Sequence, residues 1–142
     1  MSTLIPLLPH LTITDTSISV RGNDKYTIYG LGENILFESE QDQVQGKAKD
    51  KLEQISKSIK KRFSNYWIAV YGNTDATGDA DLNQKLSAKR AESVKNWLVD
   101  NAGVSTEKIS MGAMGEKDPV ASNASEQGRK MNRRVEIVVM NP

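Results

Sequence analysis

The chain has 142 residues, of which 37% are hydrophobic and 26% charged, and its formal net charge is +1. These values are typical of one globular domain, and they provide no positive field that would attract nucleic acid or an anionic membrane surface. The chain lacks cysteine and has a single histidine, His10, which excludes disulfides and thiolate chemistry and argues against imidazole-based catalysis. We therefore predict a protein that is not an enzyme and that uses no metal or cofactor.

The chain also shows no sign of crossing a membrane by itself. No apolar run approaches the roughly 18 to 20 residues that a spanning helix needs. The opening segment has no basic residues and is interrupted by Pro6 and Pro9, so it is not typical of a signal peptide. We expect any membrane attachment to come from a tether that this sequence does not contain.

The N-terminal third predicts a flexible arm over 1–12 and a hairpin over 13–35. A weakly alternating segment, a turn and a returning segment follow one another at Thr12–Val20, Arg21–Asp24 and Tyr26–Tyr29. Gly30–Gly32 is expected to interrupt the returning strand, and it is too short for a phosphate-binding loop. This hairpin is expected to extend the sheet or to contact a partner.

Two long amphipathic helices are predicted further along. In the first, apolar residues recur at helical spacing, at Ala48, Leu52, Ile55, Ile59 and Phe63. Its opposite face carries lysines that form either a solvated surface or a basic binding face: Lys47, Lys49, Lys51, Lys57, Lys60 and Lys61. The second helix is expected over about 81–101, with Gly103 in the usual position after a helix C-terminus.

Short strands and a short helix complete the pattern. Strands are expected at Tyr66–Tyr71, Lys108–Met114 and Arg134–Met140, with a short helix over about 125–131. The order β-β-α-β-α-β-α-β favours an α+β fold. We expect a two-layer α/β sandwich whose mixed sheet has about four strands, with two long helices packed on one face and an N-terminal hairpin extension. We expect residues 13–142 to form a single domain.

Arg90 falls on the apolar side of the second helix. On a wheel of about 100° per residue, it shares a stripe with Asn83 and with several apolar residues. These residues are Leu82, Leu86, Ala91, Val94, Trp97 and Leu98. An unpaired buried charge costs several kcal/mol, so Arg90 needs an acidic partner, and Asp75, in the preceding turn, is the nearest candidate. Such an acid and base at the edge of a core would suit a small zwitterionic ligand.

Other interpretations of these residues remain open. Asp75 could cap backbone amides of its own turn, while Asp79 or Asp81 could cap the helix. The three aspartates loosely resemble a calcium loop, but its glycine and closing glutamate are missing. Alternation along the last strand turns either Arg133 or Arg134 inward, and a pair of surface arginines is also common.

Motifs at fixed spacing run from Leu36 to Met140. They are Leu36-Phe37, Val70-Tyr-Gly72 with Thr74-Asp75 and Gly78, Asn83 with Leu86-Ser87, Arg90-Ala91, Gly115-Glu116 with Pro119, Gly128-Arg129, and Asn132-Arg-Arg-Val-Glu-Ile137. In these motifs the sequence resembles the OmpA C-terminal domain family, which includes peptidoglycan-associated lipoproteins and MotB-type stator proteins. One departure is visible: the family usually has histidine before the Thr-Asp pair, and this chain has Asn73. We therefore expect no pH sensitivity of the kind that an imidazole confers.

The resemblance implies non-covalent binding of peptidoglycan through the meso-diaminopimelate of its stem peptide. It implies that Asp75 receives the ammonium of that group and that Arg90 meets its carboxylate. Supporting contacts are implied for Thr74, Asn83, Leu86, Arg133 and the segment around Phe37. The protein is then expected in the periplasm, tethered to the outer or inner membrane, as a cell-wall anchor with envelope proteins as further partners. The alternative is a protein-interaction module of an envelope or secretion complex whose wall-binding groove has degenerated.

Overall fold

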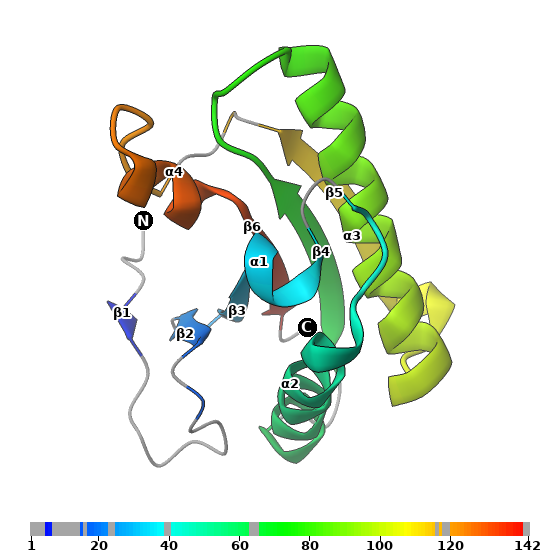
Figure 1. Ribbon diagram of the computed structural model, residues 1–142. Helices are drawn as coiled ribbons and strands as arrows, with labels where there is room; N and C mark the ends of the chain where they lie inside the picture. The colour runs from blue at the N-terminus through cyan, green and yellow to red at the C-terminus, as the bar shows by residue number, and fades with distance from the viewer. Residues whose placement is uncertain are drawn as a thin grey trace.

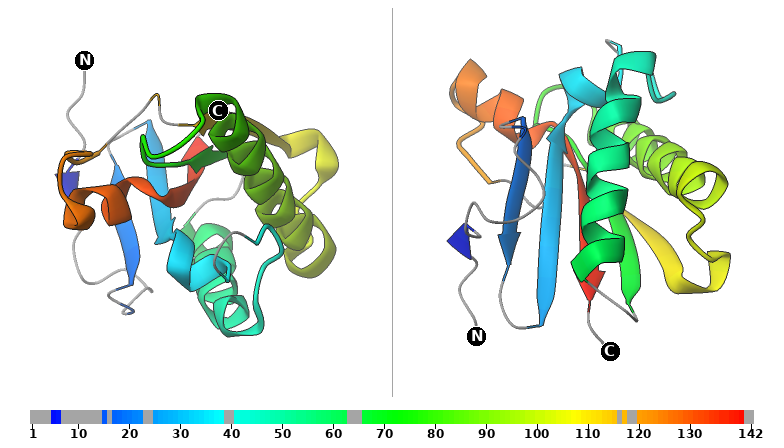
Figure 2. Two further views of the ribbon diagram at one scale, coloured as in Figure 1. Left: turned by 45° about the horizontal axis from the view of Figure 1, so that its top comes forward. Right: turned by 90° about the horizontal axis from the view of Figure 1, so that it is seen from below.

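The chain folds into one mixed sheet with its two long helices against one face (Figures 1 and 2). The structure is a computed structural model that describes residues 5–6, 15, 17–22, 25–38, 41–62, 66–115, 117 and 120–140. The strands are β1 (Ile5–Pro6), β2 (Ile18–Gly22), β3 (Tyr26–Gly32), β4 (Trp67–Asn73), β5 (Ile109–Gly115) and β6 (Arg134–Met140). The helices are α1 (Glu33–Leu36), α2 (Lys49–Arg62), α3 (Ala80–Ala102) and α4 (Glu126–Asn132), with short 3₁₀ turns at Gly46–Ala48 and Thr106–Lys108.

The sheet confirms the predicted fold class and is wider than expected. Its six strands lie in the order β1-β2-β3-β6-β4-β5. The central strand β6 pairs antiparallel with β3 and β4, while β4 and β5 are parallel and are joined through α3. The hairpin is part of this same sheet, because β3 pairs with β6 along its whole length. Within the span expected as a flexible arm, Ile5–Pro6 pairs with β2, and the other residues of 1–12 lie outside the described residues.

The expected break at Gly30–Gly32 is wrong. Strand β3 continues through these residues, and Gly32 lies opposite Arg134 on β6. The two glycines weaken strand propensity, but β3 has a neighbour on each side, β2 and β6. Those pairings satisfy the backbone groups and override the local preference. The continuous strand carries the chain to the end of the sheet before α1 begins.

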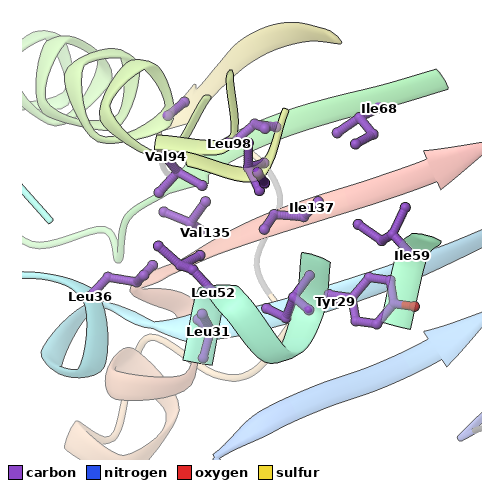
Figure 3. Packing of buried hydrophobic residues seen from close by; sticks show 14 of the residues in the cluster. Tyr29, Leu31, Leu36, Leu52, Ile59, Ile68, Val94, Leu98, Val135 and Ile137 are labelled. Atoms are coloured by element: carbon purple, nitrogen blue, oxygen red, sulfur yellow. The ribbon is translucent and has the colours of Figure 1, made fainter. Parts of the chain in front are cut away.

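Helix α2 and the core behave as the periodicity predicts. Ala48, Leu52, Ile55 and Ile59 are almost completely buried. Figure 3 shows Leu52 and Ile59 among the side chains of this core. Phe63 lies outside the described residues. Five of the six lysines are exposed, as a solvated face requires. The sixth, Lys51, pairs with Asp15; its hydrogen bond is the main cause that lowers the pKa of that carboxyl from 3.8 to about 2.

Helix α3 has the predicted ends but a shifted buried face. Asp79 caps its first turn, accepting from the backbone of Asp81 and Leu82, and Gly103 follows its end with φ 71°. Leu82 is 64% exposed, so the expectation that it lies in the apolar stripe is wrong. The buried face is centred on Ala91, Val94 and Leu98 instead. Leu82 lies more than about 100° away from that centre on the helical wheel.

Gly72 lets α3 approach β4 closely. A Cβ atom at this position would lie 2.1 Å from the backbone carbonyl oxygen of Ser87 on α3. We expect Gly72→Ala to lower the free energy of unfolding by about 1–3 kcal/mol, because helix and strand must separate to admit the methyl group. Urea unfolding measures this effect. Gly46→Ala is the matched control, since a Cβ there meets nothing within 4 Å; equal stability of the two variants would contradict the close-approach explanation.

Candidate functional site

The register of the sheet brings three distant segments together at one end. Gly32 on β3 and Asn73 on β4 are both opposite Arg134 on β6. The residues that follow Gly32 and Asn73 and precede Arg134 therefore lie close together at this end of the sheet. They are Glu33, the Thr74–Asp75 turn and Arg133. The backbone N–H of Glu33 donates to the carbonyl of Arg133 at 2.8 Å, which fixes α1 against the start of β6.

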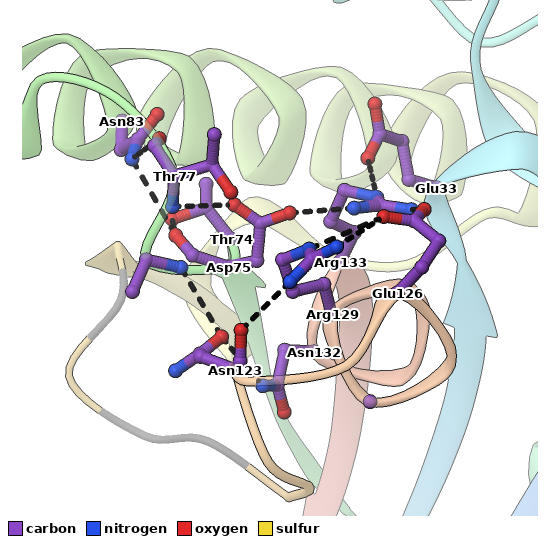
Figure 4. Close-up of polar contacts among 12 residues, drawn as sticks. Glu33, Thr74, Asp75, Thr77, Asn83, Asn123, Glu126, Arg129, Asn132 and Arg133 are labelled. Atoms are coloured by element: carbon purple, nitrogen blue, oxygen red, sulfur yellow. Dashed lines mark hydrogen bonds and ion pairs between the residues drawn. The ribbon is translucent and has the colours of Figure 1, made fainter.

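A chain of ion pairs connects these segments with α3. Figure 4 shows the part of it around Asp75, Arg133, Glu33 and Glu126. The Arg133 guanidinium lies 2.5 Å from Oδ2 of Asp75 and 3.2 Å from Oε2 of Glu33. A third nitrogen of Arg133 lies 2.8 Å from Oε1 of Glu126 on α4. Glu33 also reaches α3, where its Oε1 is 3.0 Å from Nη1 of Arg90. The order of charges is thus Asp75, Arg133, Glu33, Arg90.

Arg90 is buried as the helical wheel predicts, but its predicted partner is wrong. The residue is only 4% exposed. Among the described residues, it pairs with Glu33, donates from Nε to the carbonyl of Gln41 at 2.9 Å, and lies 4.9 Å from the centroid of the Phe37 ring. Asp75 belongs to the same chain of charges two steps away. The acid that neutralises Arg90 comes from β3–α1 rather than from the turn before the helix.

Asp75 is a buried carboxylate that remains ionised. It is 7% exposed, and burial alone would raise its pKa. The backbone N–H of Thr77, which donates to Oδ1 at 2.8 Å, and the Arg133 side chain outweigh that effect and lower the pKa below its ordinary 3.8. Burial likewise opposes the charge of Arg133, but Glu126 and Asp75 raise its pKa above the usual value. Both charges of this pair are therefore present at neutral pH.

The other predicted site residues surround these charges. Asn83 donates to the carbonyl of Thr77 at 2.8 Å and to that of Asp75 at 3.4 Å, so it holds the turn against α3. Thr74 donates to the carbonyl of Asp75 at 3.0 Å. Phe37 is 1% exposed and lies beside Arg90. Leu86 is half-buried on α3, four residues before Arg90.

A second set of hydrogen bonds, which the sequence analysis missed, positions α4. Asn132 is fully buried, and its Oδ1 accepts from the backbone of Val120 and Ala121 at 2.7 and 2.9 Å. Its amide also donates to Oδ1 of Asn123, which accepts from the backbone N–H of Ala76 as well. The segment before α4 is thereby tied to the Asp75 turn. Asn132 belongs to the Asn-Arg-Arg motif, of which the sequence analysis considered only the two arginines.

A cleft of about 730 Å³ opens beside the ion-pair chain. Its lining contains both signs of charge and one aromatic ring: Glu33, Asn34, Phe37, Glu38, Gln45, Lys47, Glu126, Lys130 and Arg133. Asp75 and Arg90 are not among these residues. Glu33 and Arg133 therefore stand between the cleft and the two charges that the sequence singles out. A ligand in the cleft would first contact Glu33 and Arg133.

In the part of the chain that the structure describes, no group of three or more histidine, cysteine, aspartate or glutamate side chains could hold a metal ion. The helices in those residues are too short or too polar to cross a lipid bilayer.

The chain is thus an α+β domain with two long helices on one face of a mixed sheet and a charged cleft at the strand ends. Residues 36–133 match the model of the OmpA family, and the chain belongs to that family.

Individual relatives add detail. The chain is 32% identical over 124 residues to "Probable lipoprotein YiaD" of Escherichia coli, covering 87% of this chain and 56% of that protein. It is 46% identical over 72 residues to the peptidoglycan-binding protein ArfA of Mycobacterium tuberculosis, covering 51% and 22% of the two chains. The structure is similar to that of the cell wall anchor of the T6SS from Pseudomonas aeruginosa, with a TM-score of 0.80, 28% identity and 89% of each chain covered. The chain thus spans about half of YiaD and about a fifth of ArfA.

Proposed function

We propose that this domain binds peptidoglycan without cleaving it, through the meso-diaminopimelate of the stem peptide. In this proposal it anchors an envelope protein or machine to the cell wall, in the periplasm, through a tether outside this chain. The names of two similar proteins, a peptidoglycan-binding protein and a cell wall anchor, support the general role.

The observation that carries the proposal is a pair of buried, opposite charges behind a cleft of mixed charge. The free end of diaminopimelate has an ammonium and a carboxylate on one carbon. Arg90 has the planar guanidinium that binds a carboxylate with two parallel hydrogen bonds. Asp75 has an ionised carboxylate that can accept an ammonium. Arg133 and Phe37 line the cleft through which the ligand would enter.

The other site residues have supporting roles in this proposal. Thr74 and Asn83 hold the Asp75 turn in place through hydrogen bonds to its backbone. Leu86 and Phe37 supply apolar surface beside the charges. Because these side chains are fixed by the sheet register and by α3, the site needs little rearrangement of its backbone to accept a ligand.

Titration with two muropeptides tests the proposal. One contains diaminopimelate, and the other contains lysine, which keeps the ammonium but lacks the second carboxylate. We expect the first to shift amide resonances at 33–37 and 74–77, and the second to bind at least about tenfold more weakly, since Arg90 gains no partner from it. An absence of shifts with both ligands would contradict the proposal.

A protein-interaction module is the second candidate. It is favoured by the fact that both site charges already have partners within the chain, Arg133 for Asp75 and Glu33 for Arg90. In a groove that no longer binds the cell wall, we expect the site charges to be neutralised by such internal ion pairs. The same titration separates the two candidates, because an interaction module would leave the resonances near Arg90 unchanged.

A further inference from the structure

Arg90 is paired in a way that leaves part of its guanidinium unused. Nε donates to Gln41, and Nη1 lies 3.0 Å from Glu33. Nη2 is buried and, among the described residues, has no hydrogen-bond partner. A buried donor without a partner is unfavourable, because it has lost its hydrogen bonds to water. A carboxylate placed differently from that of Glu33 could bind Nη1 and Nη2 together.

The carboxylate of Glu33 has few contacts that would keep it beside Arg90. Its Oε2 is buried and has an ion pair with Arg133 at 3.2 Å, but it accepts no hydrogen bond from the residues that the structure describes. Its side chain is 20% exposed and borders the cleft of about 730 Å³. Its backbone is fixed by the hydrogen bond to Arg133, so only the side chain needs to turn. The carboxylate can therefore leave Arg90 and enter the cleft without unfolding α1.

Replacement of Glu33 at Arg90 by a ligand requires that the ligand bring a negative charge. Arg90 is 4% exposed, so it cannot give up Glu33 unless another anion replaces it. A ligand carboxylate meets that condition. A ligand that carries only an ammonium does not, because it would leave the guanidinium buried and uncompensated.

We propose that Glu33 is a specificity-determining residue: it occupies Arg90 in the free protein and yields this place only to a ligand that brings its own carboxylate. The inference rests on the proposed function, since it concerns the same site. Glu33 then lowers the affinity for every ligand, but it penalises carboxylate-free ligands most, which is selection by competition.

Glu33→Gln tests this proposal in the whole chain. Glutamine keeps the size and a hydrogen-bond acceptor, and it removes the charge that competes for Arg90. We expect the variant to bind the diaminopimelate muropeptide about tenfold more tightly than the parent chain, as when a minor binding-competent state becomes dominant. Affinity for the lysine muropeptide should rise by a larger factor than that, because Glu33 penalises this ligand most, so the difference in affinity between the two muropeptides should narrow. A residue with a merely structural role would lose affinity on substitution.

Glu92→Gln is the matched control. Glu92 is exposed on α3 and is not among the residues that line the cleft. This variant has the same change in net charge, so it should bind both muropeptides like the parent chain. If Glu33→Gln fails to fold, Glu33→Asp takes its place, since a shorter side chain retains the charge and withdraws it from Arg90.

The outcomes separate the two proposals. Unchanged or weaker binding of the diaminopimelate muropeptide by Glu33→Gln, with normal binding by the parent chain, would overturn the role of Glu33 and leave the proposed function intact. An equal gain in Glu92→Gln would also overturn it, because a general charge effect would then explain both. A lack of binding by the parent chain and by Glu33→Gln would overturn the proposed function itself.

Discussion

Replacing Arg90 with alanine is expected to abolish binding of the diaminopimelate muropeptide. Truncating one member of a buried, hydrogen-bonded charge pair costs about 2–5 kcal/mol, and the ligand carboxylate would lose both of its hydrogen bonds. Isothermal titration calorimetry measures this loss. Lys89→Ala is the matched control, since it removes the same charge from an exposed neighbouring position on α3. A folded Arg90→Ala variant with the affinity of the parent chain would refute the assignment of Arg90 to the ligand carboxylate.

Loss of binding must be separated from loss of folding in that variant. Arg90→Ala leaves Glu33 without its partner on α3 and takes the cation away from Phe37. We therefore expect a lower melting temperature as well. Adding Glu33→Gln removes the uncompensated carboxylate. The double variant should regain stability but not binding, which identifies the guanidinium itself as the binding group.

Asp75→Asn is expected to have the second largest effect on binding. Asparagine keeps the shape of the side chain but cannot compensate an ammonium, so the loss is expected to be about 2–5 kcal/mol by the same calorimetry. Asp81→Asn, at an exposed position in the first turn of α3, provides the control with an equal change of charge. Retained affinity in Asp75→Asn would show that another carboxylate receives the ammonium.

Asp75 also links stability to pH. Its pKa in the folded chain is lower than the ordinary 3.8, because hydrogen bonds from Thr77 and Arg133 outweigh the effect of burial. The ionised group thus stabilises the fold above pH 3.8, and this contribution disappears as pH falls through the lower, folded-state pKa. The difference in unfolding free energy between parent chain and Asp75→Asn should be constant near neutrality and shrink in acid. A constant difference throughout the acid range would contradict this.

The main elements of the fold could be predicted because their signals are local. Apolar residues at helical spacing identified α2, and Asp79 and Gly103 marked the ends of α3. Strand β6 was predicted with its observed bounds, Arg134–Met140. The errors came from tertiary pairing. Gly30–Gly32 continues a strand because β2 and β6 flank it. Local strand propensity gives no information about such pairing.

The burial of Arg90 was predictable, but the ion pairs that connect it to its neighbours were not. The periodicity of α3 correctly placed Arg90 among buried side chains. Its partner could not be found in this way, because Glu33 meets Arg90 only after β3, β6 and β4 align in one register. Proximity in sequence favoured Asp75, whereas proximity in space selected Glu33. The signal available was a buried arginine that needed an acid, together with a glutamate four residues after the predicted strand Tyr26–Tyr29.

The chain of alternating charges gives the site a consistent chemistry. Glu33 and Arg133 offer a carboxylate and a cation to Arg90 and Asp75, which are the two groups that the proposed ligand would offer. Binding would therefore exchange internal ion pairs for ligand ion pairs without leaving a buried charge unpaired. Such an exchange yields modest net affinity and strict chemical selection, since the new pairs must first replace the old ones.

A crystal structure of the complex with the diaminopimelate muropeptide tests this account most directly. We expect the free carboxylate of the ligand within about 2.7–3.2 Å of both terminal nitrogens of Arg90, its ammonium at Asp75, and the Glu33 side chain turned into the cleft. A ligand bound elsewhere, with Glu33 still paired to Arg90, would contradict the account.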